Sequence, residues 1–371
     1  MFFKLNTNSL RNALTKILSV VEKKSTQPIL SYALIEVESN YLILSATDTE
    51  IHAQVKVPIQ STENISFCVN AKNLFDILKE LPDSELSLKL ENNSNIVNLI
   101  NGDIHYSLLI YSANDFPRLK PKQNKYNLTL KSDELLNMIS KTSHAISNDE
   151  TRMYLNGIFF QEIDLKLRAV ATDGHRLSLS EMNVDNNSID TLVNGIIVPK
   201  KGVAELKRMA ESFIDGEIKL TVDESFIYAS TLDEYFLSIR LIARDYPKYQ
   251  AVIPSKTSFK ITTDRDSLFD AVKRIKIMSN EKSNQIRVNI KEKELTLMAN
   301  HPSLGKAKEK IDITYSGKEM EIGFNAKYLI DTLSTLNEGD ISIELNNELS
   351  PVIIKSQSLP NFLGIIMPLK L

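Results

Sequence analysis

The chain has 371 residues, a formal net charge of −3 and one cysteine. This length suits two or three domains of ordinary size, each able to bury its own core without a disulfide or a metal. A single cysteine excludes an intramolecular disulfide, and a net acidic chain argues against holding nucleic acid by bulk charge alone. No apolar run approaches the length of a membrane span, and residues 1–6 read as a strand rather than a signal peptide. We therefore expect a cytoplasmic protein in which Cys68 is a core residue.

Helical periodicity occurs in six segments, two in each third of the chain, among short alternating strands bounded by turn residues. In the first segment Leu10, Leu14 and Ile17 recur at the spacing of one helix face, and Lys16 falls on the opposite face. The six segments are residues 8–24, 71–80, 131–147, 200–211, 264–278 and 326–336. This pattern predicts an α+β fold.

Three sequence blocks recur in one order: an apolar strand closing on a polar turn, a strand running into a helix, and an aromatic or methionine before proline. Their anchors are Asp48, Asp173 and Asn300, then Lys72, Lys201 and Lys327, then Phe116, Tyr246 and Met367. The anchors recur about every 121 to 130 residues, which is too long for a solenoid unit. We predict three copies of one domain, at residues 1–125, 126–254 and 255–371, each with two helices packed on antiparallel sheet.

Charge is distributed unevenly between the helices and the rest of the chain. Lysines on the solvent face of one amphipathic helix are ordinary. The six helical segments together carry +6, however, so the remainder of a chain with net charge −3 carries −9. A basic helical layer on an acidic body indicates a polyanionic partner.

Six ordered motifs from the second repeat onward resemble the bacterial DNA polymerase III beta subunit family, the DNA sliding clamps. They lie at residues 151–157, 171–177, 197–202, 278–282, 315–325 and 367–371. The resemblance implies a head-to-tail homodimer that closes into a ring around duplex DNA, with helices lining the hole. The implied function is that of a processivity factor in DNA replication, which needs only sequence-independent phosphate contacts.

The resemblance also implies residue roles. The DNA-binding positions are Lys24, Arg152, Tyr154, Lys200 and Lys201. Tyr154 either stacks on a base or packs as a strand-end core residue. Met153 stands where related clamps often carry tyrosine.

A peptide groove between the second and third domains is implied as the docking site for short linear motifs. Its partners would be the polymerase III alpha subunit, the clamp loader, other polymerases and repair proteins. The matching positions are Leu155, Thr172, Gly174, His175, Arg176, Leu177, Pro247, Val252, Pro351, Ile365, Ile366, Met367, Pro368 and Leu369. Aliphatic residues and an adaptable methionine suit an apolar peptide, although residues 365–367 also read as an ordinary final strand.

Ring closure is assigned by the resemblance to Tyr106 and Leu108 on one edge and Ile277 and Met278 on the other. The helical wheel supports this independently, because Ile277 lies about half a turn from the apolar stripe of its helix. It would be an exposed hydrophobe unless a partner covers it.

Two other functions remain as alternatives. One is a ring-shaped structural protein that does not act on DNA. The other is a hydrolase that uses Asp173 and His175, but the chain has no nucleophile elbow, phosphate loop or metal-ligand spacing. We therefore predict no enzyme activity, no metal and no cofactor.

Overall fold

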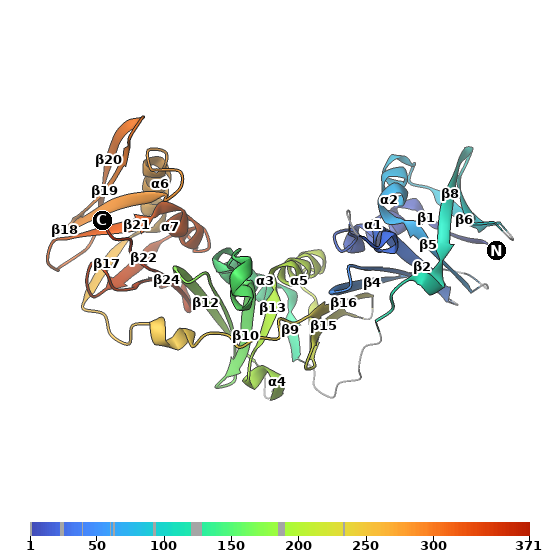
Figure 1. The fold of residues 1–371 in the computed structure, drawn as a ribbon, viewed down its shortest axis with the longest axis horizontal. Coiled ribbons are helices and arrows are strands. Elements are labelled where there is room, and N and C mark those ends of the chain that lie inside the picture. Colours follow the sequence, from blue (N-terminus) through green and yellow to red (C-terminus); the bar gives the residue numbers. More distant parts are fainter. Residues whose placement is uncertain are drawn as a thin grey trace. The chain divides into compact units, whose positions relative to one another are not determined.

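The structure is a computed structural model that describes residues 2–22, 26–38, 40–59, 61, 64–91, 94–119, 128–184, 190–232 and 234–371 (Figure 1). The chain forms two compact units, residues 1–135 with 201–241, and residues 136–200 with 242–371. The central third of the sequence therefore contributes to both units.

Repeat one is the run from β1 to β8, in which each helix follows a strand (Figure 1). Its elements are β1 (Phe2–Asn6), α1 (Thr7–Leu18), η1 (Pro28–Ser31), β2 (Tyr32–Glu38), β3 (Tyr41–Thr47), β4 (Ile51–Pro58), β5 (Ile65–Asn70), α2 (Ala71–Glu80), β6 (Glu85–Leu90), β7 (Ile96–Asn101), β8 (Ile104–Ser112) and η2 (Ala113–Asp115).

Repeat two is the run from β9 to β16 and keeps this order, with the short α4 added. Its elements are β9 (Leu128–Lys131), α3 (Ser132–Thr142), η3 (Ser143–Ala145), η4 (Glu150–Leu155), β10 (Gly157–Ile163), β11 (Lys166–Thr172), β12 (Arg176–Asn183), α4 (Asp190–Val193), β13 (Ile196–Pro199), α5 (Lys200–Ser212), β14 (Glu217–Val222), β15 (Phe226–Thr231), β16 (Tyr235–Arg240) and η5 (Tyr249–Val252).

Repeat three is the run from β17 to β24. Its elements are β17 (Phe259–Asp264), α6 (Arg265–Lys276), β18 (Gln285–Lys291), β19 (Glu294–His301), β20 (Gly305–Asp312), β21 (Met320–Asn325), α7 (Ala326–Leu333), β22 (Asp340–Leu345), β23 (Val352–Ser356) and β24 (Leu359–Ile366). The same strand–helix order in all three repeats confirms the predicted α+β repeat.

Side chains at the ends of β1, β5, β17 and β21 cap the helices that follow these strands directly. Asn6 Oδ1 accepts from the backbone N–H of Asn8 at 2.8 Å, and Asn70 Oδ1 accepts from that of Asn73 at 2.9 Å. Asn325 caps α7 in the same way. The predicted apolar stripes are buried, as the helical periodicity required, including Leu10, Ala13, Leu14 and Ile17 in α1 and Leu268, Ala271, Val272 and Ile275 in α6.

The strands form three sheets in which every described pair is antiparallel. A twelve-stranded sheet has the order β1-β6-β7-β8-β5-β2-β3-β4-β16-β15-β14-β9, an eight-stranded sheet β13-β10-β11-β12-β24-β23-β22-β17, and a four-stranded sheet β20-β19-β18-β21. Repeat one thus joins repeat two where β4 pairs with β16, and repeat two joins repeat three where β12 pairs with β24. We call these contacts the first and second joints.

Among the strand edges that lack a partner in the described part of the chain, two matter for the joints. Strand β20 pairs with β19 alone, and residues 104–109 of β8 pair with β7 alone. In the repeat order, β20 corresponds to β4 and β12, whereas β8 corresponds to β16 and β24. The open edges of β20 and β8 are therefore the counterparts of the strands that form the two joints.

Strand registers fix which residues correspond between repeats. Tyr32, Gly157 and Gln285 lie opposite Asn70, Pro199 and Asn325, and Leu34, Phe159 and Arg287 lie opposite Ser45, Val170 and Met298. Counting along β3, β11 and β19 from these pairs, Asp48 corresponds to Asp173 and to His301. The expectation that Asn300 is the counterpart was wrong by one residue.

Turn geometry supports this correction. The side chains of Asp48, Asp173 and His301 each accept a hydrogen bond from the backbone N–H two residues later, at 3.0, 2.9 and 3.2 Å. The third turn is also one residue longer, because Asn300 pairs with Lys306 whereas Thr47 pairs with His52. Spacing in the sequence could not reveal that shift.

Candidate functional site

The first joint combines strand pairing with side chains from two helices. The N–H of Arg240 donates to the carbonyl of Glu50 at 2.8 Å, at the end of the paired strands. The Lys201 ammonium, at the start of α5, forms an ion pair with the Asp48 carboxylate, of which only 5% is exposed. One turn further along α5, the fully buried Glu205 accepts from the Ser19 hydroxyl at 2.8 Å.

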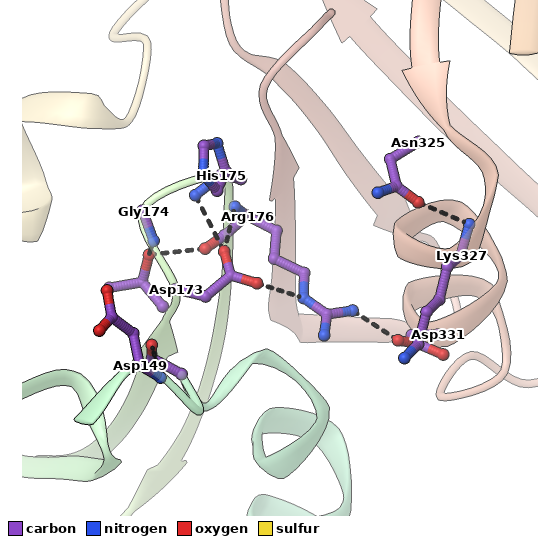
Figure 2. A network of polar contacts seen from close by, with 10 residues as sticks. Asp149, Asp173, Gly174, His175, Arg176, Asn325, Lys327 and Asp331 are labelled. Carbon is purple, nitrogen blue, oxygen red and sulfur yellow. Dashed lines mark hydrogen bonds and ion pairs between the residues drawn. The ribbon is translucent and has the colours of Figure 1, made fainter. Parts of the chain in front are cut away.

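The second joint repeats the backbone contact but uses a different ionic arrangement (Figure 2). The N–H of Met367 donates to the carbonyl of His175 at 2.8 Å, as Arg240 does at the first joint. Figure 2 shows the Arg176 guanidinium lying between two carboxylates, Asp173 at 3.1 Å and Asp331 on α7 at 2.6 Å. Its charge also lies 4.5 Å from the centre of the Tyr328 ring, a cation–π contact.

Because Arg176 is 8% exposed and already bonded, it is a structural part of the joint. Asp173 Oδ1 accepts from the backbone N–H groups of His175 and Arg176, and its Oδ2 accepts from the Arg176 side chain. Neither carboxylate oxygen receives a bond from the His175 imidazole, so the geometry does not favour the hydrolase alternative.

His144 lies beside this ionic cluster. Burial lowers the pKa of His144 to about 4, and the nearby Arg176 charge also lowers it. The carboxylates of Asp331 and Asp173 act in the opposite direction and raise this pKa. Neither ring nitrogen has a hydrogen-bond partner among the described residues. His144 is therefore a neutral buried imidazole beside charged groups.

The predicted groove residues all belong to the second compact unit and divide into two sets. Leu155, Thr172, Arg176, Leu177, Ile365 and Ile366 are buried, whereas Gly174, His175, Pro247 and Val252 are exposed and Pro351, Met367, Pro368 and Leu369 are half-buried. Pairing of β12 with β24 brings the two central stretches together, with Leu177 opposite Ile365. The tail is held beyond this strand, because the Leu369 N–H donates to the Gly323 carbonyl at 2.8 Å.

An apolar cluster lies beneath the paired strands. Leu177 and Ile365 pack in it with Phe159 and with Tyr249 from η5, and Tyr246 stacks on Phe159 with ring centres 4.6 Å apart. The rings and β-branched side chains support β12 and β24 from one face. This aromatic support was not anticipated from the sequence, although the tyrosine–proline block at 246–247 carries part of it.

The predicted DNA-binding residues have different surroundings. Lys24 lies outside the described residues. Lys200 is exposed and bonds Asn148 at 2.6 Å, whereas the Lys201 ammonium is paired with Asp48. Arg152 pairs with Asp149 at 2.8 Å, and Tyr154 is half-buried against the apolar cluster.

The predicted ring-closure residues lie at the open edges. Tyr106 is 39% exposed and Leu108 half-buried on β8, whereas Ile277, directly after α6, is 73% exposed. Met278 packs partly against the core of repeat three. By register, Tyr106 and Leu108 correspond to Leu237 and Ile239 of the first joint, both fully buried.

Sequence reasoning missed Asp48, Glu205, Tyr328 and Asp331 as joint residues. A signal was present in the helices: Glu205 and Asp331 each stand one helical turn after the repeated lysines Lys201 and Lys327. Asp76 stands at the same distance from Lys72 in repeat one.

The described part of the chain was compared with the requirements of a metal site, a membrane span and a reactive cysteine. No group of histidine, cysteine or acidic residues there could hold a metal ion. None of its helices is long and apolar enough to cross a membrane. Burial raises the pKa of the Cys68 thiol to about 12, which fits a core residue and not a nucleophile.

Comparisons with known proteins give one family. Profiles for the N-terminal, central and C-terminal domains of the DNA polymerase III beta subunit match residues 1–120, 129–248 and 250–370. The beta sliding clamps of Proteus mirabilis and Escherichia coli K12 are each 32% identical over the full length of both chains. A crystal structure of the DNA polymerase III beta subunit from Pseudomonas aeruginosa superposes with a TM-score of 0.95 at 30% identity, again with full coverage of both chains. A sliding clamp from the same organism bound to griselimycin gives a TM-score of 0.95 at 31% identity with the same coverage. The chain therefore belongs to the DNA polymerase III beta subunit family, the beta sliding clamps.

Proposed function

We propose that this protein is a sliding clamp: a head-to-tail homodimer whose closed ring encircles duplex DNA and tethers the replicative polymerase. One observation carries the proposal. The open edges of β20 and β8 are the counterparts of strands that pair at both internal joints. Exposed strand edges invite pairing, and a heterologous contact that closes on itself makes a ring. The domains of this ring are residues 1–125, 126–254 and 255–371.

The register of the internal joints specifies the register between subunits. At the first joint Leu237 lies opposite Ala53. Their counterparts are Tyr106 and Ala307, so we expect Tyr106 of one subunit to lie opposite Ala307 of the other. Leu108 then lies near Gly305, with Ile277 and Met278 at the adjacent end of α6.

A double variant, Tyr106→Cys with Ala307→Cys, tests this register. Residues opposite one another on antiparallel strands lie about 4.5–5.5 Å apart at Cα, which a disulfide can span. We expect a dimer crosslinked at both interfaces under mild oxidation, seen on a non-reducing gel. Leu109→Cys with Ala307→Cys is the matched control, because it shifts the pair out of register. Equal crosslinking of both variants would contradict the pairing.

Contacts to DNA would come from exposed basic groups, with no base-specific reader. Lys200 and Lys201, together with Lys24, Arg152 and Tyr154, remain our proposed contacts. Because Lys201 already faces Asp48, we expect Lys200→Ala to weaken DNA retention more than Lys201→Ala. DNA retention measured at a series of salt concentrations separates the two variants. Each lost phosphate contact reduces the slope of the logarithm of the binding constant against the logarithm of the salt concentration by about 1.

Partner docking would use a groove over the paired β12 and β24 and the tail. The half-buried Met367, Pro368 and Leu369 supply apolar contacts, and the exposed Gly174 and His175 border them. The polymerase III alpha subunit, the clamp loader and other polymerases and repair proteins are the proposed partners, through short linear motifs. Deleting residues 367–371 should abolish polymerase binding while the solution mass remains that of a dimer. Unchanged polymerase binding by the truncated protein would overturn this assignment.

We further propose that the protein has no catalytic activity and needs no cofactor, and that it acts in the cytoplasm. The engaged carboxylate of Asp173 supports the first point. A ring that never meets DNA remains the second candidate only if neutralising the basic residues leaves DNA retention unchanged.

A further inference from the structure

Both internal joints carry an ionic contact that crosses from one repeat to the next at a helix. At the first joint a carboxylate on the turn, Asp48, meets a cation on the helix, Lys201. At the second joint the charges are reversed, because Arg176 on the turn meets Asp331 on α7 at 2.6 Å. Both joints therefore place opposite charges on the turn and on the helix. The turn carries the negative charge at the first joint and the positive charge at the second.

Register and helix position identify the corresponding residues at the open edges. The turn positions in repeat three are His301, matching Asp48, and Gly305, matching Arg176. The helix positions in repeat one are Lys72, matching Lys201, and Asp76, matching Asp331, and both are exposed. The helix α2 thus presents a cation and a carboxylate, one for each polarity.

Repeat three can complete neither arrangement. His301 offers no carboxylate to Lys72 of the partner subunit, and Gly305 has no side chain to offer Asp76 of the partner subunit. A third crossing contact is missing as well. Ser19 donates to Glu205 at the first joint, but the residue at its place after α6 is the exposed Ile277.

We propose, on the basis of the homodimer proposed above, that the joint between subunits lacks the helix-end ion pair of both internal joints. The open edges offer strand pairing and apolar side chains there, so a carboxylate added at position 301 should strengthen the joint and slow the exchange of subunits. The occupant of the open edge is a second copy of this chain, because the corresponding edges are covered within the chain by its own repeats.

The substitution His301→Asp tests the inference directly. An aspartate there keeps the local turn, since Asp48 and Asp173 accept the same backbone hydrogen bond that His301 accepts from Ser303. It also places a carboxylate opposite the partner's Lys72. Dissociation of the dimer must break both interfaces of the ring. A modest slowing from the new ion pair at each interface therefore multiplies in the rate of subunit exchange. We expect subunit exchange about fivefold slower than wild type at low salt, with the difference shrinking in 1 M salt.

Exchange is measured by energy transfer between differently labelled dimers, after the solution mass has been determined. Lys72→Ala in the His301→Asp background should restore the wild-type rate. Lys72→Ala alone should leave the rate unchanged, since wild type makes no ion pair there. A faster exchange for Lys72→Ala alone, or no slowing by His301→Asp, would overturn the inference. A monomeric wild-type protein would instead overturn the proposed homodimer, so the two failures are distinguishable.

Discussion

The first and second joints share one backbone pattern but differ in the side chains that cross them. At the first joint the ion pair lies at the rim, where Lys201 is half exposed, and a hydroxyl reaches the buried Glu205. At the second joint a nearly buried guanidinium bonds two carboxylates beside a neutral histidine. The two joints therefore share the same strand pairing. The charged groups that cross them differ, so we expect the two joints to respond differently to salt and pH.

Removing the guanidinium of the second joint should have the largest effect. Arg176→Ala leaves Asp173 and Asp331 without their shared cation, and we expect a loss of about 3 kcal/mol in unfolding free energy. Urea denaturation measures it. Arg176→Lys, which keeps the charge but not the bridge, should lose less. A loss under 0.5 kcal/mol for Arg176→Ala would show that the bridge does not hold the joint.

Acid should weaken the second joint through His144. Its folded pKa of about 4 lies below the ordinary value of 6.5, so the unfolded chain binds more protons between these values. Stability is complete above about pH 6.5 and falls as the pH drops toward 4, by about 2.5 kcal/mol for this group at pH 4.5. Urea midpoints at pH 7 and pH 4.5 give the loss, and His144→Phe should reduce it by that amount. An identical loss in the variant would exclude His144 as its source.

The hydroxyl at the first joint should have a smaller effect. Ser19→Ala removes a donor from the buried Glu205, and a hydrogen bond to a charged group contributes about 1.5 kcal/mol. Thermal unfolding compared with Ser9→Ala, on the exposed face of the same helix, isolates the contribution. Equal effects of the two substitutions would mean that the contact contributes nothing.

The rim ion pair should contribute least. Lys201→Ala is expected to lower stability by about 0.5–1 kcal/mol at low salt, because an exposed cation gains little from pairing. The difference from wild type should vanish in 1 M salt. A salt-independent loss would indicate lost packing of the lysine stem instead of lost charge.

Much of the fold was predictable from the sequence, because helical periodicity and recurring blocks are local signals. The buried stripe of α1 at Leu10, Leu14 and Ile17 appeared as expected, as did the order of elements in each repeat. The equivalence of His301 was not predictable by spacing, because a turn longer by one residue is visible only in the strand register.

The joints were less predictable than the repeats. The contacts of Arg176 with Asp331 and Tyr328 join residues more than 150 positions apart in the chain, and its place in the groove stays a prediction. Such pairing depends on which strands meet, and the sequence does not state that. The ion pair of Lys201 with a carboxylate from another repeat was likewise not predictable, and its contact with DNA stays a prediction.

The most direct test of the account is the solution mass by light scattering, combined with retention on nicked circular and on linearised DNA after loading. A topological clamp requires a dimer that stays on circles and is lost from linear ends. A monomer, or equal retention on both forms of DNA, would contradict the closed ring.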